Sequence, residues 1–220
     1  MKHLVALTFA AALTAAAAGP STLPVPATPA EADPGWQAFI NGRSADALQH
    51  YRKEAERGQR VAQYNLAVML LQGLGTRARP AEGVKWLRQS AEAGFAQAQR
   101  ALALLYEHGR HVQRSPAASV DWNRRAAEQG FRDAQVDLAT HFLLGRGVAQ
   151  SDAEAARWYE RAAAQGDAGA CYIIASLYEK GHGVARDLER AVFWYLQAAM
   201  RGEAGASELA QALIDRMDAI

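Results

Sequence analysis

The chain of 220 residues has one cysteine, no surplus of either charge and no long apolar run beyond its first residues. With Cys171 alone, no intrachain disulfide can form, so the fold must be stable through packing. The 24 Lys and Arg side chains nearly balance 23 Asp and Glu side chains, which disfavours nucleic acid or anionic lipid as the main partner. A bilayer span needs about 20 apolar residues, and no segment after the N-terminus supplies them. We therefore predict no nucleic-acid partner and no integral membrane segment once the N-terminal run is removed.

Motifs of catalysis and cofactor binding are also missing. The sequence contains no nucleotide-binding glycine loop, no serine nucleophile elbow, no His-Glu-x2-His zinc helix and no Ser-x2-Lys acylation motif. The paired glycines that do occur are periodic, which indicates helix ends and not a phosphate cradle. We predict no catalytic residue, no cofactor and no metal, and hence no enzymatic activity.

The N-terminus is typical of an exported protein. A short basic start precedes an apolar run from Leu4 to Ala16, and small residues follow at which signal peptidase cleaves. We predict a signal peptide over 1–18, cleaved near Ala18, and a periplasmic or secreted protein; retention of the run as a membrane anchor is the alternative. Five prolines among Ser, Thr and Ala predict an extended linker over 19–34.

A repeat of 36 residues organises everything that follows. Residues of one type recur in a single phase: glycines at 58, 94, 130, 166 and 202, tryptophans at 86, 122, 158 and 194, and alanines at 62, 98, 134, 170 and 206. Such self-similarity is the signature of a tandem array. We predict a solenoid over 35–220, with a degenerate leading unit at 35–57, four units starting at 58, 94, 130 and 166, and a C-terminal capping helix at 203–219.

Each unit carries the pattern of two helices. In the third unit, Ala134, Leu138, Ala139 and Phe142 share one helical face, and Gly145 can adopt the left-handed backbone that ends a helix. The second helix of that unit places Ala155, Trp158, Tyr159 and Ala162 on one face and begins at Ser151 or Asp152 as the N-cap. In the second unit, Ser115 and Pro116 form a clear start. The phased tryptophans are predicted to belong to the core.

The repeat is similar to a known family. The fourth unit carries the pattern most completely, in Ile174, Ala175, Tyr178, Gly181, Gly183, Val184, Asp187, Ala191, Trp194, Tyr195, Ala198 and Gly202. It resembles the Sel-one-like repeat (SLR), a relative of the tetratricopeptide repeat. The resemblance implies an all-α, right-handed superhelical solenoid of antiparallel helix pairs whose first helices line a concave groove. Two positions depart from the pattern: His111 replaces the second loop glycine, and Thr76 replaces a valine.

The resemblance also places a candidate binding surface. If the register of the family holds, the variable first-helix positions face the groove at three levels. These twelve residues are Tyr64, Arg100, Val136 and Tyr172, then Val68, Leu104, Thr140 and Ser176, then Leu71, Glu107, Leu143 and Glu179. Tyr and Arg often anchor interfaces, and the mixture suits an extended peptide or a helix. The alternative is that the apolar members pack against the next unit.

Some chemically capable side chains have simpler explanations. His108, His111 and His182 fall in loops without the further ligands that a metal site needs. Cys171 could meet His141 of the preceding unit as a nucleophile and base, but a half-buried free thiol is the simpler interpretation.

The leading functional hypothesis is an exported scaffold or regulatory adaptor that binds a protein or peptide partner in its groove. A second hypothesis is weak β-lactamase-like hydrolysis, as suggested for cysteine-rich SLR relatives. Those relatives have a cysteine pair in each repeat, and this chain has one cysteine in total. A third is binding of cell-wall glycan, with Trp36 or the groove tyrosines stacking on sugar rings. The sequence does not identify the partner.

Overall fold

The computed structural model describes residues 33–219, and in this range it contains eleven α-helices and no strand. They are α2 (Pro34–Ile40), α3 (Ser44–Glu56), α4 (Arg60–Gln72), α5 (Pro80–Glu92), α6 (Ala96–His108), α7 (Pro116–Glu128), α8 (Arg132–Leu144), α9 (Asp152–Ala164), α10 (Ala168–Lys180), α11 (Leu188–Ala199) and α12 (Ala206–Asp218). The all-α prediction is confirmed. The predicted signal peptide and nearly all of the linker lie outside the described residues. Pro34, the last residue of that linker, is instead the first residue of α2, capped by Asp33.

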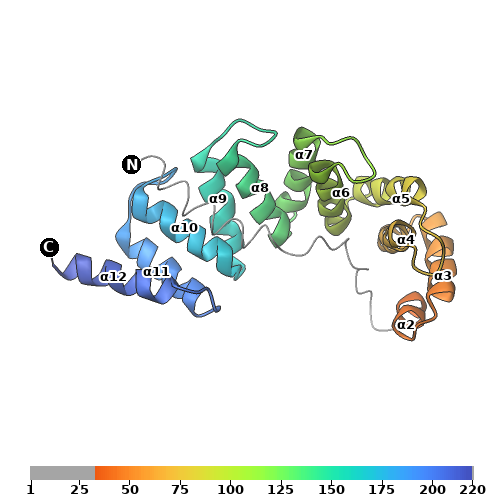
Figure 1. Cartoon of the computed structure of the whole chain (residues 1–220), viewed down its shortest axis with the longest axis horizontal. Helices are drawn as coiled ribbons and strands as arrows, with labels where there is room; N and C mark the ends of the chain where they lie inside the picture. The colour runs from red at the N-terminus through yellow and green to blue at the C-terminus, as the bar shows by residue number, and fades with distance from the viewer. Residues whose placement is uncertain (1–32, 220) are drawn as a thin grey trace.

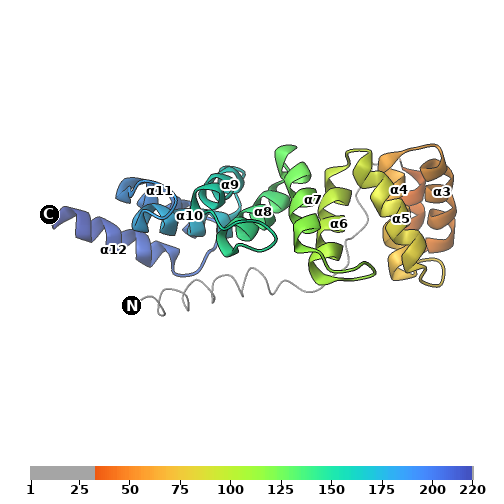
Figure 2. The ribbon, with the colours of Figure 1, turned by 90° about the horizontal axis from the view of Figure 1, so that it is seen from above.

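The helices form a solenoid of antiparallel pairs (Figures 1 and 2). The pairs α4–α5, α6–α7, α8–α9 and α10–α11 follow one another along the long axis, with α2 and α3 at one end and α12 at the other. In this part of the chain, no helix is both long and apolar enough to cross a bilayer.

Local chemistry sets the ends of the helices. Each first helix ends at a glycine in the left-handed region, as in Gly145 with φ of 64° after α8. The hydroxyl of Ser115 accepts a hydrogen bond from the Ala118 amide at 3.2 Å and caps α7. Ser151, and not Asp152, caps α9 in the same way. The predicted helix boundaries at these positions are confirmed.

A ladder of buried glutamines joins each unit to the one before it. At intervals of 36 residues, an Nε2 atom on a first helix donates to a carbonyl near the end of the preceding second helix: Gln63 to Ala55 (3.3 Å), Gln99 to Ala91 (3.0 Å) and Gln135 to Ala127 (3.2 Å). Cys171 occupies the same position in the fourth unit, and its Sγ lies 3.6 Å from the Ala163 carbonyl oxygen. The ladder fixes the register of each pair against its neighbour.

The apolar core consists of three separate clusters of buried residues. The first joins α2 and α3 to α4, the second joins α4 and α5 to α6, and the third extends from α7 to α12. The buried residues of the second cluster reach Leu105 and those of the third begin at Val120. Half-buried Trp122 of α7 packs on the second cluster and Ala96 of α6 packs on the third, so apolar contacts continue between the two.

The phased tryptophans are less uniformly buried than predicted. Trp158 is 2% exposed, with the guanidinium of Arg161 4.7 Å from its ring centroid. Trp86, Trp122 and Trp194 pack against the core but remain half-buried. Only Trp158 is enclosed on all sides, so the prediction that the period marks core residues is confirmed fully at that position alone.

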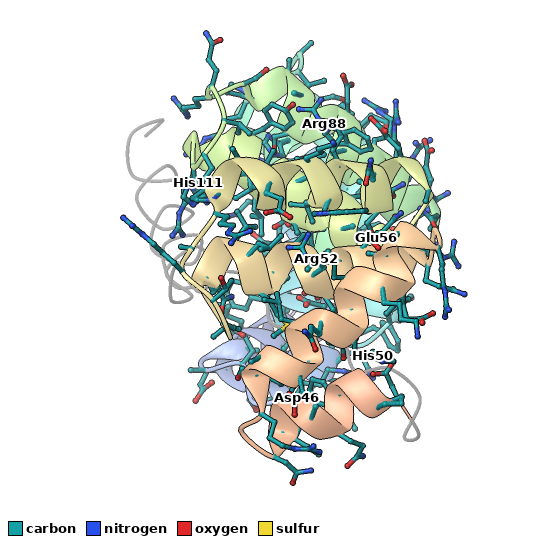
Figure 3. All side chains as sticks on the ribbon, turned by 90° about the vertical axis from the view of Figure 1, so that its right-hand side faces the viewer. Asp46, His50, Arg52, Glu56, Arg88 and His111 are labelled. Atoms are coloured by element: carbon teal, nitrogen blue, oxygen red, sulfur yellow. The ribbon has the colours of Figure 1, made fainter. Side chains whose placement is uncertain are left out.

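Figure 3 looks onto the N-terminal end, where α2 to α5 face the viewer. Arg52 of α3 donates to the carboxylate of Glu82 at the start of α5 at 2.8 Å. The guanidiniums of Arg52 and Arg79 more than offset the effect of partial burial and lower the pKa of Glu82. His50 takes the position of the phased tryptophans and is half-buried, edge to face with the ring of Tyr51.

Candidate partner-binding surface

We call the twelve variable positions named above the first-helix surface, and their burial differs from unit to unit. Eight of them are half-buried and reach solvent: Arg100, Leu104, Glu107, Val136, Thr140, Leu143, Tyr172 and Glu179. Four are buried: Tyr64 at 4% exposure, Val68 at 0%, Leu71 at 4% and Ser176 at 6%. The first unit therefore contributes its three residues to the core, and the accessible part of the surface begins at α6.

The burial of Tyr64 has a specific cause. Its ring packs edge to face on Phe95, with centroids 5.4 Å apart. The residue at the position of Phe95 in the fourth unit is Glu203, and the Tyr172 ring instead packs edge to face on Tyr195, with centroids 5.4 Å apart, and stays half-buried.

Arg100 links neighbouring first helices on this surface. Its Nε donates to Asp137 Oδ2 at 2.7 Å, and its Nη1 lies 3.4 Å from Asp133 Oδ2. Burial lowers the pKa of the guanidinium, but the two carboxylates more than compensate and raise it above its ordinary value. Arg100 is thus always charged and already paired within the protein.

Tyrosines of the second helices contact residues of the first-helix surface through their hydroxyl groups. The hydroxyl of Tyr159 lies 2.8 Å from the Thr140 hydroxyl, and the hydroxyl of Tyr195 donates to Glu179 Oε2 at 3.1 Å. Burial raises the pKa of Tyr159 to about 12, and burial also raises that of Tyr195. Both phenols therefore remain protonated and serve as hydrogen-bond donors at neutral pH.

A buried polar cluster replaces apolar residues between α6, α7 and α8. Ser119 Oγ lies 3.3 Å from His141 Nε2, and Glu107 Oε2 lies 4.0 Å from the same nitrogen. His141 Nδ1 is 2.9 Å from the Arg146 carbonyl oxygen. A serine hydrolase needs its carboxylate on the ring nitrogen opposite the serine. Here both groups face Nε2, so the cluster lacks that relay.

Cys171 does not pair with His141. Its side chain is 0% exposed, against the half-buried thiol predicted, and its Sγ contacts the Ala163 carbonyl. Burial raises the pKa of the Cys171 thiol, so it remains protonated and poorly nucleophilic. The ring nitrogens of His141 are occupied by Ser119 and the Arg146 carbonyl.

The loop histidines do not assemble a metal site in the described range. His108, His111 and His182 are exposed, and residues 33–219 contain no group of three His, Cys, Asp or Glu side chains that could hold a metal ion. His111 has a φ of 61°, the one positive value at a non-glycine residue in this range. It takes this conformation because the repeat requires a glycine there.

An open pocket of about 760 Å³ lies beside the first-helix surface and was missed from the sequence. Residues of α3 and of the starts of α4 and α6 line it, among them His50, Arg60 and Phe95, together with Phe131 just before α8. Phe95 and Phe131 are 36 residues apart. This recurrence of an aromatic residue just before a first helix was the only feature of the sequence that could have indicated the pocket.

Comparisons with known proteins agree with this architecture. A family model described as the Sel1 repeat matches four consecutive segments, 60–95, 96–131, 132–167 and 168–203. A search among curated proteins found no match.

Two solved structures of bacterial proteins are similar in sequence and fold. A protective antigen of uropathogenic Escherichia coli with an SLR fold is 33% identical, with a TM-score of 0.73, over 77% of this chain and 38% of the antigen. A Sel1 repeat protein from Oxalobacter formigenes is 32% identical, with a TM-score of 0.72, over 77% of this chain and 50% of that protein. This chain thus spans half or less of the length of either relative. The four matched repeats, each beginning with a first helix and including the second, show that the chain belongs to the Sel1 repeat family.

Proposed function

We propose that this protein is an exported, non-catalytic scaffold that holds a partner protein or peptide along its first-helix surface. Sel1 repeat proteins generally act as protein-interaction scaffolds, and the solenoid is generally non-enzymatic. A solenoid offers a long, continuous surface to which each unit adds side chains at a fixed interval.

The observation that carries the proposal is the composition of the accessible surface. From α6 to α10, eight predicted positions remain half-buried, and they include an arginine, a tyrosine, two carboxylates and three aliphatic residues. Arg and Tyr are enriched among residues that dominate binding energy. A mixture of aromatic, aliphatic and charged side chains suits an extended peptide or an amphipathic helix.

Export is the second part of the proposal. It is supported by the apolar run from Leu4 to Ala16 and the small residues after it. Expression of the full chain in a bacterial host, followed by osmotic shock and intact-mass measurement, tests it directly. A periplasmic protein that lacks residues 1–18 supports the proposal, and a full-length membrane-bound protein contradicts it.

Site-specific photocrosslinking in cells tests the binding surface. A benzophenone amino acid is placed at Leu104 or Val136 on the first-helix surface, and at exposed Arg157 on α9 as the matched control. We expect one discrete crosslinked protein from the first two positions and none from the third. Crosslinks of equal yield from all three positions, or from Arg157 alone, would show that binding occurs elsewhere.

A further inference from the structure

The open pocket beside the first-helix surface lies where residues 19–32 join the solenoid. Its volume is about 760 Å³, and Asp33, the first described residue, is part of its lining. His50 of α3 (Figure 3), Arg60 at the start of α4 and Phe131 just before α8 also line it. The pocket therefore extends across the beginnings of successive first helices from the point at which that segment enters the fold.

Aromatic and apolar side chains form much of the lining. Phe95 and Phe131 are both half-buried, so part of each ring remains accessible to solvent. Val61 and Ala96 are half-buried in the same lining. Grooves lined by aromatic rings bind proline-rich segments, which are already extended and lose little conformational entropy on binding.

Arg60 gives the pocket a cation without an anionic partner. In the third unit, the equivalent Arg132 lies 3.8 Å from Asp167, the residue just before the next first helix. Phe95 holds that position in the first unit, so Arg60 finds no carboxylate there. Arg60 is exposed and forms no ion pair with any residue in the range 33–219.

The two carboxylates of the lining are already engaged within the fold. Glu54 accepts a hydrogen bond from Arg57 Nη1 at 2.7 Å. Asp33 Oδ1 accepts from the Trp36 amide at 2.7 Å and caps α2. A carboxylate that enters the pocket therefore meets Arg60 as a cation that is not yet paired.

Residues 19–32, the proline-rich segment, lie outside the described range, and their sequence supplies groups that match the pocket. Prolines at 20, 24, 26 and 29 favour the polyproline II conformation and have no amide proton to donate. Leu23 and Val25 add apolar side chains, and Glu31 is the one charged residue of the segment. At about 3.1 Å per residue, the ten residues before Asp33 reach about 31 Å from it.

We infer that the pocket binds the proline-rich segment of its own chain as an extended peptide, with prolines against the rings of Phe95 and Phe131 and with Glu31 paired to Arg60. Glu31 is two residues from Asp33, so its carboxylate is tethered within reach of the side chains that share the lining with Asp33. The inference goes beyond the proposed function, because it requires neither a partner nor export. Its consequence is that any ligand of the pocket must first displace the segment.

Disulfide trapping in the purified protein tests the inference. The whole chain is used, with or without its predicted signal peptide, and oxidised with glutathione disulfide. Ala27→Cys is combined with Gln97→Cys in the lining, or with Lys53→Cys, which is exposed on α3 outside the lining, as the matched control. We expect the pair with Gln97→Cys to form an intrachain disulfide at least tenfold faster on non-reducing gels. Buried Cys171 is common to both proteins and stays protonated.

Further variants separate docking from mere proximity. Arg60→Gln and Glu31→Gln should each slow the trapping about threefold, and together no more than either alone, since both remove the same ion pair. Phe131→Ala should slow it by removing one of the two rings. Arg157→Gln, at an exposed position of α9, should leave the rate unchanged.

Three outcomes would overturn the inference. Equal trapping rates at Gln97 and Lys53 would show that the segment does not prefer the pocket. A rate that neither Arg60→Gln nor Phe131→Ala changes would show that the segment passes the pocket without contact with these side chains. A disulfide between two chains, in place of the intrachain one, would assign the pocket to the segment of a second copy.

Discussion

Ala93 occupies a position at which the next two units place a glutamine. Gln129 Nε2 donates to Gln99 Oε1 at 2.7 Å, and Gln165 Nε2 donates to Gln135 Oε1 at 2.7 Å. The corresponding acceptor in the first unit is Gln63 Oε1, which is buried and has no partner among the described residues. The ladder of glutamines is therefore extended by a second hydrogen bond in two units and left incomplete in the first.

Ala93→Gln should complete it. The backbone is already suitable, since φ and ψ are −73° and 5° at residue 93 and −77° and 1° at residue 129. Satisfying a buried acceptor contributes about 1–3 kcal/mol, and ordering one half-exposed Gln side chain costs up to about 1 kcal/mol. We expect a net stabilisation of about 1 kcal/mol.

Removing the corresponding glutamine from a unit that has it should lower the stability. Gln165→Ala would leave Gln135 Oε1 buried without a donor and should destabilise the protein by about 1–2 kcal/mol. Urea unfolding followed by far-UV circular dichroism measures both, with Ala164→Gln at an exposed position of α9 as the control for helix propensity. The reasoning is refuted if Ala93→Gln is no more stable than that control, or if Gln165→Ala loses nothing.

Three further predictions concern the loops, the core and pH. His111→Gly should stabilise the protein by about 0.5–1 kcal/mol in a thermal melt, because it removes a side chain from the left-handed region; a lower midpoint would contradict this. Trp158→Ala should cost about 3–5 kcal/mol and Trp194→Ala clearly less, as half-buried Trp194 loses fewer contacts; the reverse order in urea melts would refute the burial argument. The pKa of Glu82 is lower in the folded protein than its ordinary value of about 4.5. The ionised carboxylate therefore stabilises the fold above that pH, and this stabilisation is lost as the pH falls through the folded pKa. Glu82→Gln should thus destabilise the protein by under about 1 kcal/mol at neutral pH and should not destabilise it in acid. A difference in unfolding free energy that does not change with pH would exclude the Arg52 pair as the cause.

The helix boundaries followed from the sequence because their causes are local. Ser115 before Pro116 starts a helix, and Gly145 ends one, whatever the rest of the chain does. The 36-residue phase then gave the order of the pairs, since each unit can bury its apolar face only against its neighbours.

The accessible residues of the first-helix surface were harder to predict because they depend on neighbours from other helices. Tyr64 and Tyr172 share one phase, yet the Tyr64 ring packs on Phe95 and is buried, whereas the Tyr172 ring packs on Tyr195 and stays half-buried. Burial of a repeated position thus depends on which side chains of other helices pack on it, and the repeat pattern does not give these.

The glutamine ladder also bears on how the array can change in length. Both ends of each bond keep the repeat phase, as Gln99 with Ala91 repeats Gln63 with Ala55. An in-frame duplication of 36 residues between Gln63 and Gln135 would therefore keep a glutamine and its carbonyl acceptor at the new junction. The two related proteins are both longer than this chain. The hydrogen bonds dictate how long a unit is and leave the number of units free, so tandem duplication can lengthen the first-helix surface without a redesign of the core.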